Sequence, residues 1–335
     1  MNVSQETDEL LSNAISSQAS DIHFCPFGDN VFIYYRIHGN RIHKQTLSLS
    51  KYEQLLSYLK FTSGMDIGEI LIPQNGVSFL KEDKESYALR LSTLPVQSTE
   101  SLAIRILPQR QVPQLNELFL YPNQLQRIKS WMNHRAGLVL FTGPTGSGKT
   151  TTLYALLQSL LAERSVQTIT LEDPIENQLK DILQVQVNEK AGIDYNAGLK
   201  AALRHDPDIL MVGEIRDATT AKFAIRAAQT GHLVLSSLHA KDAFGTLSRM
   251  LEMGVTKTDL QQTLVAVASQ QLLPLLQHDE VSTPHTRAAI LELLDNNHLL
   301  NAFNGISPYQ DQSFPSFPRL RRKAYALGYI SKQII

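Results

Sequence analysis

One stretch of eight residues, GPTGSGKT from Gly143 to Thr150, matches the G-x-x-x-x-G-K-[ST] pattern of a phosphate-binding loop. The apolar run at 137–142 that precedes it suits a buried strand. After it, leucines recur at the spacing of an amphipathic helix, at Leu153, Leu156, Leu157, Leu160 and Leu161. A strand, a glycine-rich loop and a helix in this order let backbone N–H groups and the positive helix end surround phosphate oxygens. The chain is therefore predicted to bind a nucleoside phosphate within an α/β fold.

The residue types within this loop predict which atoms bind the nucleotide. Lys149 is expected to reach the β- and γ-phosphates, and the hydroxyl of Thr150 is expected to ligate magnesium. ATP and Mg²⁺ are the expected cofactors. The predicted nucleotide-binding residues are Gly143, Pro144, Thr145, Gly146, Ser147, Gly148, Lys149, Thr150 and Thr151.

Composition excludes several other kinds of protein. The 335 residues contain a single cysteine, Cys25, so neither a disulfide framework nor a cysteine-rich zinc module fits within one chain, and no zinc is expected. The net charge of −1 gives no sign of a nucleic-acid partner. The first residues lack the basic and apolar regions of a signal peptide, and no apolar run reaches the length of a membrane span. We expect a soluble, cytoplasmic protein.

The order of strand-like and helix-like segments predicts two domains. Residues 1–107 alternate short strands with helices, as in a small mixed α/β domain, and one helix is predicted to begin at a capping box of Ser50 and Glu53. A linker of proline and polar residues follows at 108–117. Residues 118–335 alternate apolar strands with helices, which predicts a mostly parallel sheet covered on both faces, followed by a helical region.

Element boundaries in the second domain follow from apolar runs and capping residues. Asp217 and Asp242 are expected to cap two helices that end near Gly231 and Gly254. Residues 307–318 are expected to be irregular, and a last helix is expected at 319–335. The strands are expected at 139–142, 167–171, 183–187, 209–212 and 233–238.

Acidic residues and a histidine follow three of these predicted strands. In a doubly wound sheet, the carboxyl ends of the strands form the edge where ligands bind. Glu214 is expected to organise magnesium, directly or through water, and His239 is a candidate sensor of the γ-phosphate. Glu176 is the predicted general base and Glu172 the second candidate, since hydrolysis needs a group that orients or deprotonates water. Seen alone, the acidic turn that holds both glutamates fits a solvated surface turn equally well.

Four stretches taken together resemble one family. GPTGSGKTTTLY, TLEDPIE, RHDPDILMVGEIRD and TGHLVLSSLHA are similar to the Walker A, aspartate, Walker B and histidine boxes of the secretion and type IV pilus traffic ATPases, and the resemblance runs from residue 19 to about residue 293. It implies a PAS-like N-terminal domain and a RecA-like ATPase domain. It also implies a homo-hexameric ring at the cytoplasmic face of the membrane, working with a polytopic membrane platform protein. Finally, it implies that Arg90 and Arg105 reach the γ-phosphate when the domains close.

The departures from the family pattern indicate which members of the family this sequence resembles most. The chain has no four-cysteine insert, and no AIRNLI-type segment of the retraction motors follows Ala289–Asp295. The pattern is most similar to family members that assemble the competence pilus of Gram-positive bacteria for DNA uptake. The alternatives are a retraction motor, a nucleotide-gated binding module and a DNA motor of the same fold.

The expected partners also follow from this resemblance. No direct nucleic-acid binding is expected from the neutral overall charge, and membrane association is expected to occur through the platform protein. A basic cluster near the end of the sequence is typical of a solvated helix face, with acidic lipid or a protein partner as alternatives. Its members are Arg319, Arg321, Arg322 and Lys323.

Overall fold

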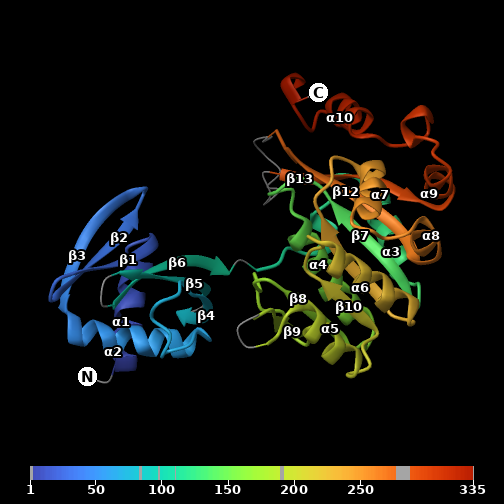
Figure 1. The fold of residues 1–335 in the computed structure, drawn as a ribbon. Helices are drawn as coiled ribbons and strands as arrows, with labels where there is room; N and C mark the ends of the chain where they lie inside the picture. The colour runs from blue at the N-terminus through green and yellow to red at the C-terminus, as the bar shows by residue number, and fades with distance from the viewer. Residues whose placement is uncertain are drawn as a thin grey trace. The chain divides into compact units, whose positions relative to one another are not determined.

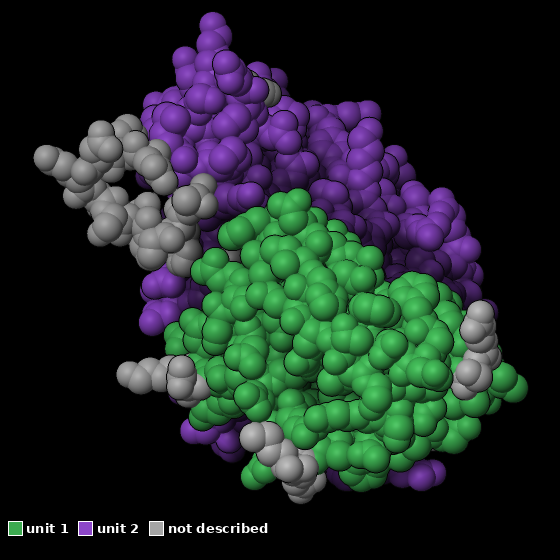
Figure 2. Space-filling model, turned by 90° about the vertical axis from the view of Figure 1, so that its left-hand side faces the viewer, with its two compact units in different colours: residues 1–111 green, residues 112–335 purple. Residues whose placement is uncertain are grey.

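The computed structural model describes residues 3–82, 85–96, 99–109, 111–188, 192–276 and 287–334. The chain divides into two compact units, Met1–Gln111 and Val112–Ile335, which are coloured separately in Figure 2. Of the 108–117 segment, residues 108 and 109 belong to the last strand of the first unit, and Leu115–Glu117 form a short 3-10 helix, η1, in the second. Among the described residues, no helix is both long and apolar enough to cross a membrane.

The first unit is an antiparallel sheet packed against two helices (Figure 1). Ile22 and Phe24 of the sheet are fully buried against Leu11 of the first helix and Tyr52 of the second. This is the expected mixed α/β fold. The strands, in the order β3-β2-β1-β6-β5-β4, and the helices are β1 Ala19–Phe27, β2 Asn30–Ile37, β3 Asn40–Ser48, β4 Asn75–Glu82, β5 Glu85–Val96, β6 Thr99–Gln109, α1 Val3–Ser16 and α2 Leu49–Thr62.

The start of α2 differs from the prediction. The helix begins at Leu49 with Ser48 as its N-cap residue, and no side chain caps it, so the predicted capping box of Ser50 and Glu53 is wrong. The backbone N–H of Leu49 instead donates to the carbonyl of Asp29 at 2.9 Å. A tertiary contact therefore satisfies one of the N–H groups that the start of a helix leaves without an intrahelical partner.

The second unit is built on a mostly parallel sheet in the order β13-β12-β7-β11-β10-β8-β9. Only β13 runs antiparallel to its neighbour, β12. This arrangement confirms the predicted RecA-like class of fold, and the five predicted strands are present. The bounds are β7 Gly137–Thr142, β8 Thr168–Glu172, β9 Leu183–Gln186, β10 Ile209–Val212, β11 Leu233–Leu238, β12 Leu264–Pro274 and β13 Arg287–Asp295; the last two were not predicted.

Helices cover both faces of this sheet because its strands are apolar on both sides. Along β7, Leu138 and Leu140 face one core, and Val139 and Phe141 face the other. Asp217 and Asp242 accept from backbone N–H groups at the starts of α6 and α7, as predicted. The first core packs α5 Tyr195–Leu203, α6 Ala218–Gln229, α7 Ala243–Glu252, α8 Lys257–Thr263 and α9 Asn296–Phe303, and the second packs α3 Pro122–Trp131 and α4 Lys149–Glu163.

The last described segment contains a helix that is shorter than predicted. Helix α10 spans Phe317–Ala326 and packs on β13 beyond the main core (Figure 1). The predicted helix from 319 to 335 is wrong at both ends. Gly328 adopts a φ of +78°, a left-handed conformation that ends the helix, and a short 3-10 turn follows at Lys332–Ile334.

Candidate functional site: a phosphate-loop cavity

The loop from Gly143 to Gly148 turns sharply between β7 and α4. Gly143 has a φ of +141°, and a Cβ atom there would lie 2.5 Å from the carbonyl oxygen of Gln270. Gly148 is the N-cap residue of α4 in the left-handed conformation. Glycine is therefore required at both positions, by close approach at the first and by backbone conformation at both. The N–H groups at the start of α4 are left facing the loop, as a phosphate site needs.

Lys149 holds a positive charge beneath this loop. Its side chain is buried, with 8% of the residue exposed, and its Nζ donates to the carbonyls of Gly143 at 3.0 Å and Pro144 at 3.2 Å. Burial lowers the pKa of Lys149, while the charges of Glu214 and Glu176 raise it. Among the described residues no carboxylate forms an ion pair with Nζ. A cation held by neutral carbonyls fits an anionic ligand such as a triphosphate.

A cavity of about 480 Å³ opens beside the loop. It brings together most of the residues predicted from the sequence. The residues predicted for the site that line it are Thr145, Gly146, Gly148, Lys149, Thr150, Thr151, Glu172, Glu176, Glu214 and His239. Gly143, Pro144 and Ser147 do not line it; they form the turn that supports it. The oxygen atoms of Thr150 and Glu214 are of the kind that magnesium prefers.

The two candidate bases differ in their surroundings. Glu172, the last residue of β8, is 3% exposed, and its two carboxylate oxygens accept hydrogen bonds from Tyr154, from Thr170 at 2.6 Å and from Gln184 at 3.1 Å. Burial raises the pKa of Glu172, and these donors oppose the rise. Glu176 is exposed and lines the cavity. Glu172 is thus held in place by donors, whereas Glu176 is open to the ligand space.

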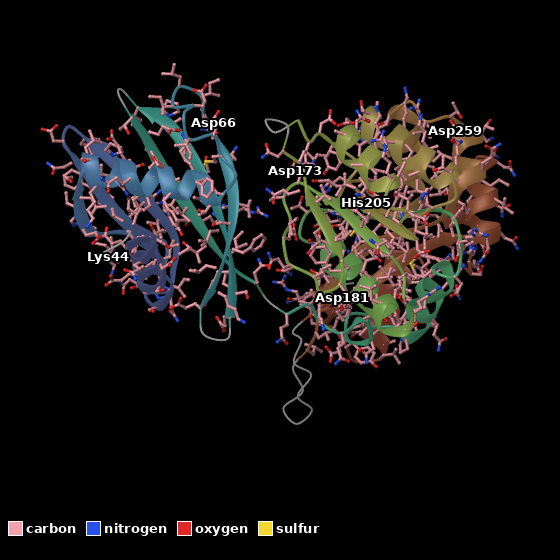
Figure 3. All side chains as sticks on the ribbon, turned by 90° about the horizontal axis from the view of Figure 1, so that it is seen from below. Lys44, Asp66, Asp173, Asp181, His205 and Asp259 are labelled. Carbon is pink, nitrogen blue, oxygen red and sulfur yellow. The ribbon has the colours of Figure 1, made fainter. Side chains whose placement is uncertain are left out.

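The ends of β8, β10 and β11 carry a connected group of charges. Arg216 donates from Nε to Glu214 at 2.6 Å and forms an ion pair with Asp173 at 3.2 Å; Asp173 is labelled in Figure 3. His239 Nε2 lies 3.5 Å from the other oxygen of Glu214. The hydrogen bond with Glu214 raises the pKa of Arg216. Glu214 is therefore oriented from two sides, which suits a group that organises a metal ion and its waters.

Arg90 and Arg105 lie in the first unit, on neighbouring strands. They are directly opposite each other in the β5–β6 ladder, so both side chains project from the same face of the sheet. Arg105 Nε lies 2.9 Å from Asp21, and 66% of its side chain is exposed. Their proposed reach to a nucleotide stays a prediction.

Several residues of the site were not found from the sequence. Gln270 of β12 accepts from Thr152 at 2.9 Å and donates to the carbonyl of Ser147 at 2.7 Å, so it braces the loop from behind. Tyr195 lines the cavity with a buried hydroxyl that has no hydrogen-bond partner among the described residues. Arg216 could have been predicted, because it follows Glu214 directly after a strand, where ligands bind in this class of sheet.

The strand, loop and helix, set at the carboxyl edge of a mostly parallel sheet with acids facing a buried lysine, define a phosphate-loop ATPase. The chain belongs to the Type II/IV secretion system protein family, whose sequence model matches residues 2–303. That match includes the strands that carry Arg90 and Arg105 and ends within the second unit.

Individual relatives agree with this family. The chain is 41% identical over 340 residues to competence protein ComGA of Bacillus subtilis (strain 168), covering 98% of this chain and 96% of the relative. It is 40% identical to type II secretion system protein E of Klebsiella pneumoniae, covering 90% of this chain and 59% of that one.

Two solved structures share the fold. The pilus retraction motor PilT with bound ADP has a TM-score of 0.74 at 27% identity, covering 97% of this chain and 94% of that one. The ATPase DotB of Legionella pneumophila has a TM-score of 0.77 at 22% identity, covering 98% and 93%.

Proposed function

We propose that this protein hydrolyses ATP to power assembly of a competence pilus, a type IV-like machine related to type II secretion, for DNA uptake. The observation that carries the proposal is a buried lysine, with no ion-pair partner in the described part of the chain, that shares one cavity with three glutamates. The near full-length similarity to a competence protein supports the biological role. In this proposal the working form is a homo-hexamer at the cytoplasmic face of the membrane, where it pushes on a polytopic platform protein.

Each residue of the cavity has a proposed task. Lys149 and the N–H groups of the loop hold the β- and γ-phosphates. Thr150 would ligate Mg²⁺, with Glu214 directly or through water, and the ion would neutralise charge that develops on the phosphates. His239 lies beside Glu214 and would sense the terminal phosphate. The proposed metal ligands, Thr150 and Glu214, both offer oxygen atoms, so the proposal includes ATP and Mg²⁺ and no zinc.

Glu176 is the proposed general base, since the oxygens of Glu172 are already used by buried donors. Glu172 would position the acidic turn instead of taking a proton.

Glu176→Gln is expected to lower the ATP turnover number by about 10²-fold, because a positioned base contributes at least that factor. ATP affinity should change by less than about threefold, and the melting temperature should hold, because the side chain is exposed. Steady-state phosphate release and nucleotide titration measure both quantities. Glu172→Gln is the comparison: it disturbs the buried hydrogen bonds and should lower the melting temperature. If Glu176→Gln turned over ATP normally, Glu176 would not be the base.

In this proposal, Arg90 and Arg105 complete the catalytic site. A triphosphate held in the second unit would be cut when the first unit closes and brings both guanidinium groups to the terminal phosphate, within one subunit or across a subunit boundary. Closure of successive subunits would then transmit force to the platform protein.

The biological role is tested by deleting the gene in its host and scoring DNA uptake and surface pilus fibres. The proposed assembly motor predicts that both are lost, and that the wild-type gene restores both. Excess fibres would instead indicate a retraction motor; the retraction motor PilT has a fold similar to that of this chain. Normal uptake with normal fibres would contradict any role in this machine. A nucleotide-gated binding module is distinguished by negligible phosphate release from the purified oligomer, and a DNA motor by salt-dependent binding to DNA.

A further inference from the structure

Positive charge is concentrated in the last part of the sequence. Residues 312–335 contain five basic side chains and no aspartate or glutamate, although the whole chain has a net charge of −1. Four of the five lie in helix α10 and one follows it. They are Arg319, Arg321, Arg322, Lys323 and Lys332. So strong a local excess in a nearly neutral chain calls for a physical explanation.

Helix α10 turns this charge toward solvent. Its buried face consists of Phe317, Leu320 and Ala324, which pack with residues of β12 and β13. At 100° per residue, Arg322 projects from the opposite side of the helix, and Arg319 and Lys323 flank it. Arg322 and Lys323 are exposed, and Arg319 is half-buried. The amphipathic pattern therefore fixes the orientation of the basic side chains.

The cations of α10 have no acidic partner among the described residues. Arg319 donates to the carbonyls of Asp311 and Phe314, and Arg322 donates weakly to the carbonyl of Pro318 at 3.3 Å. Lys323 lies 4.9 Å from the centre of the Tyr121 ring. These partners are neutral, so no direct ion pair within the described residues offsets the charge of these three side chains.

Exposed apolar and aromatic side chains follow Lys323 in the sequence. Tyr325, Leu327 and Tyr329 are 43%, 55% and 43% exposed. This segment is tied down, because the carbonyl of Tyr329 accepts from Leu276 at 2.9 Å and Ile330 is buried. Basic residues together with tyrosine and leucine are typical of segments that lie at a membrane interface. We call this set the α10 surface: Arg319, Arg322, Lys323, Tyr325, Leu327 and Tyr329.

We propose that the α10 surface binds anionic phospholipid directly, with its arginine and lysine side chains at the headgroups and Leu327 and the tyrosines at the interface. A convex helix face fits a broad anionic surface. Nucleic acid is less suited, because single strands are bound in grooves lined by basic and stacking side chains. This contact goes beyond the proposed function, in which only the platform protein attaches the motor to the membrane, and it requires no nucleotide.

The test is co-sedimentation of the full-length protein with vesicles of phosphatidylcholine alone or with 30% phosphatidylglycerol added. We expect at least about tenfold stronger partitioning onto the anionic vesicles at low salt, and loss of most of it at high salt. Arg322→Gln/Lys323→Gln should weaken binding about 25-fold, since each basic residue near an anionic surface contributes about fivefold. The control Lys200→Gln/Lys257→Gln removes the same charge from exposed positions on α5 and α8 and should bind like the wild type.

The outcomes separate this proposal from the ATPase. Without vesicles, the α10 double variant should hydrolyse ATP at the wild-type rate, so a lipid defect with intact turnover supports the proposal independently of the motor. Equal binding to both vesicle types, or equal loss in the two double variants, would overturn it. Tight binding to duplex DNA or to polyglutamate without binding to the anionic vesicles would assign the surface to a different partner.

Discussion

Lys149→Ala is expected to lower the ATP turnover number by about 10³-fold while the protein stays folded. The reason is that the phosphate site depends on one buried cation with no competing ion pair among the described residues. Loss of a single preorganised donor in an oxyanion site already costs about 10²–10³ in turnover, and here a full positive charge is lost with it. Phosphate release at saturating ATP measures this effect.

The same variant must be shown to be folded. Truncating Lys149 removes donors to the carbonyls of Gly143 and Pro144 but leaves no buried charge unpaired, so the free energy of unfolding should fall by no more than about 3 kcal/mol. Circular dichroism and urea denaturation check this. Lys200→Ala, on the exposed side of α5, is the matched control and should leave turnover unchanged. Turnover by Lys149→Ala above a tenth of the wild-type rate would remove Lys149 from the proposed centre.

The parts of the fold that are encoded locally were predicted from the sequence. The strand before the loop, the helix after it and the capping residues Asp217 and Asp242 all depend on neighbours within a few positions. In these segments propensity, apolar periodicity and turn chemistry agree with one another, so the local pattern is sufficient.

Strand β12 was not predicted, because the residues that allow its polar centre to be buried lie far away in the sequence. Its centre reads Ser269-Gln270-Gln271, which breaks the apolar run expected of a buried strand. Gln270 is nonetheless 1% exposed, since its amide pairs with Thr152 and with the carbonyl of Ser147. A polar side chain can enter a core when its hydrogen bonds are satisfied there, and those partners are more than one hundred residues away in sequence. Its neighbour β13 was missed with it.

The sequence predicted which residues form the candidate site better than it predicted the role of each residue. Glu172, Glu176, Glu214 and His239 do converge on one cavity. The sequence could not separate Glu172 from Glu176, because that distinction depends on Tyr154 and the other donors that occupy Glu172. Spacing within a turn indicates which acids are near one another, whereas burial decides which of them is exposed to the cavity.

Arg105→Ala is expected to lower the ATP turnover number by about 10³–10⁵-fold, the range found when an arginine that stabilises a phosphoryl-transfer transition state is lost. ATP affinity should change little, because the proposed contact forms only on closure. Stability should fall by only about 1 kcal/mol, because the Arg105 side chain is 66% exposed, although that of its partner Asp21 is only 13% exposed. Single-turnover hydrolysis and nucleotide titration of the oligomer separate these quantities.

Arg90→Ala should behave in the same way, because Arg90 lies opposite Arg105 on the same face of the sheet. Asp21→Asn is the decisive control: it breaks the ion pair with Arg105 but keeps the guanidinium group, so turnover should stay within a few-fold of the wild type. If Asp21→Asn were as damaging as Arg105→Ala, the arginine would serve the first unit's own structure. If both arginine variants hydrolysed ATP normally, hydrolysis would not need these side chains of the first unit. Closure between the units could then not be the step that triggers hydrolysis.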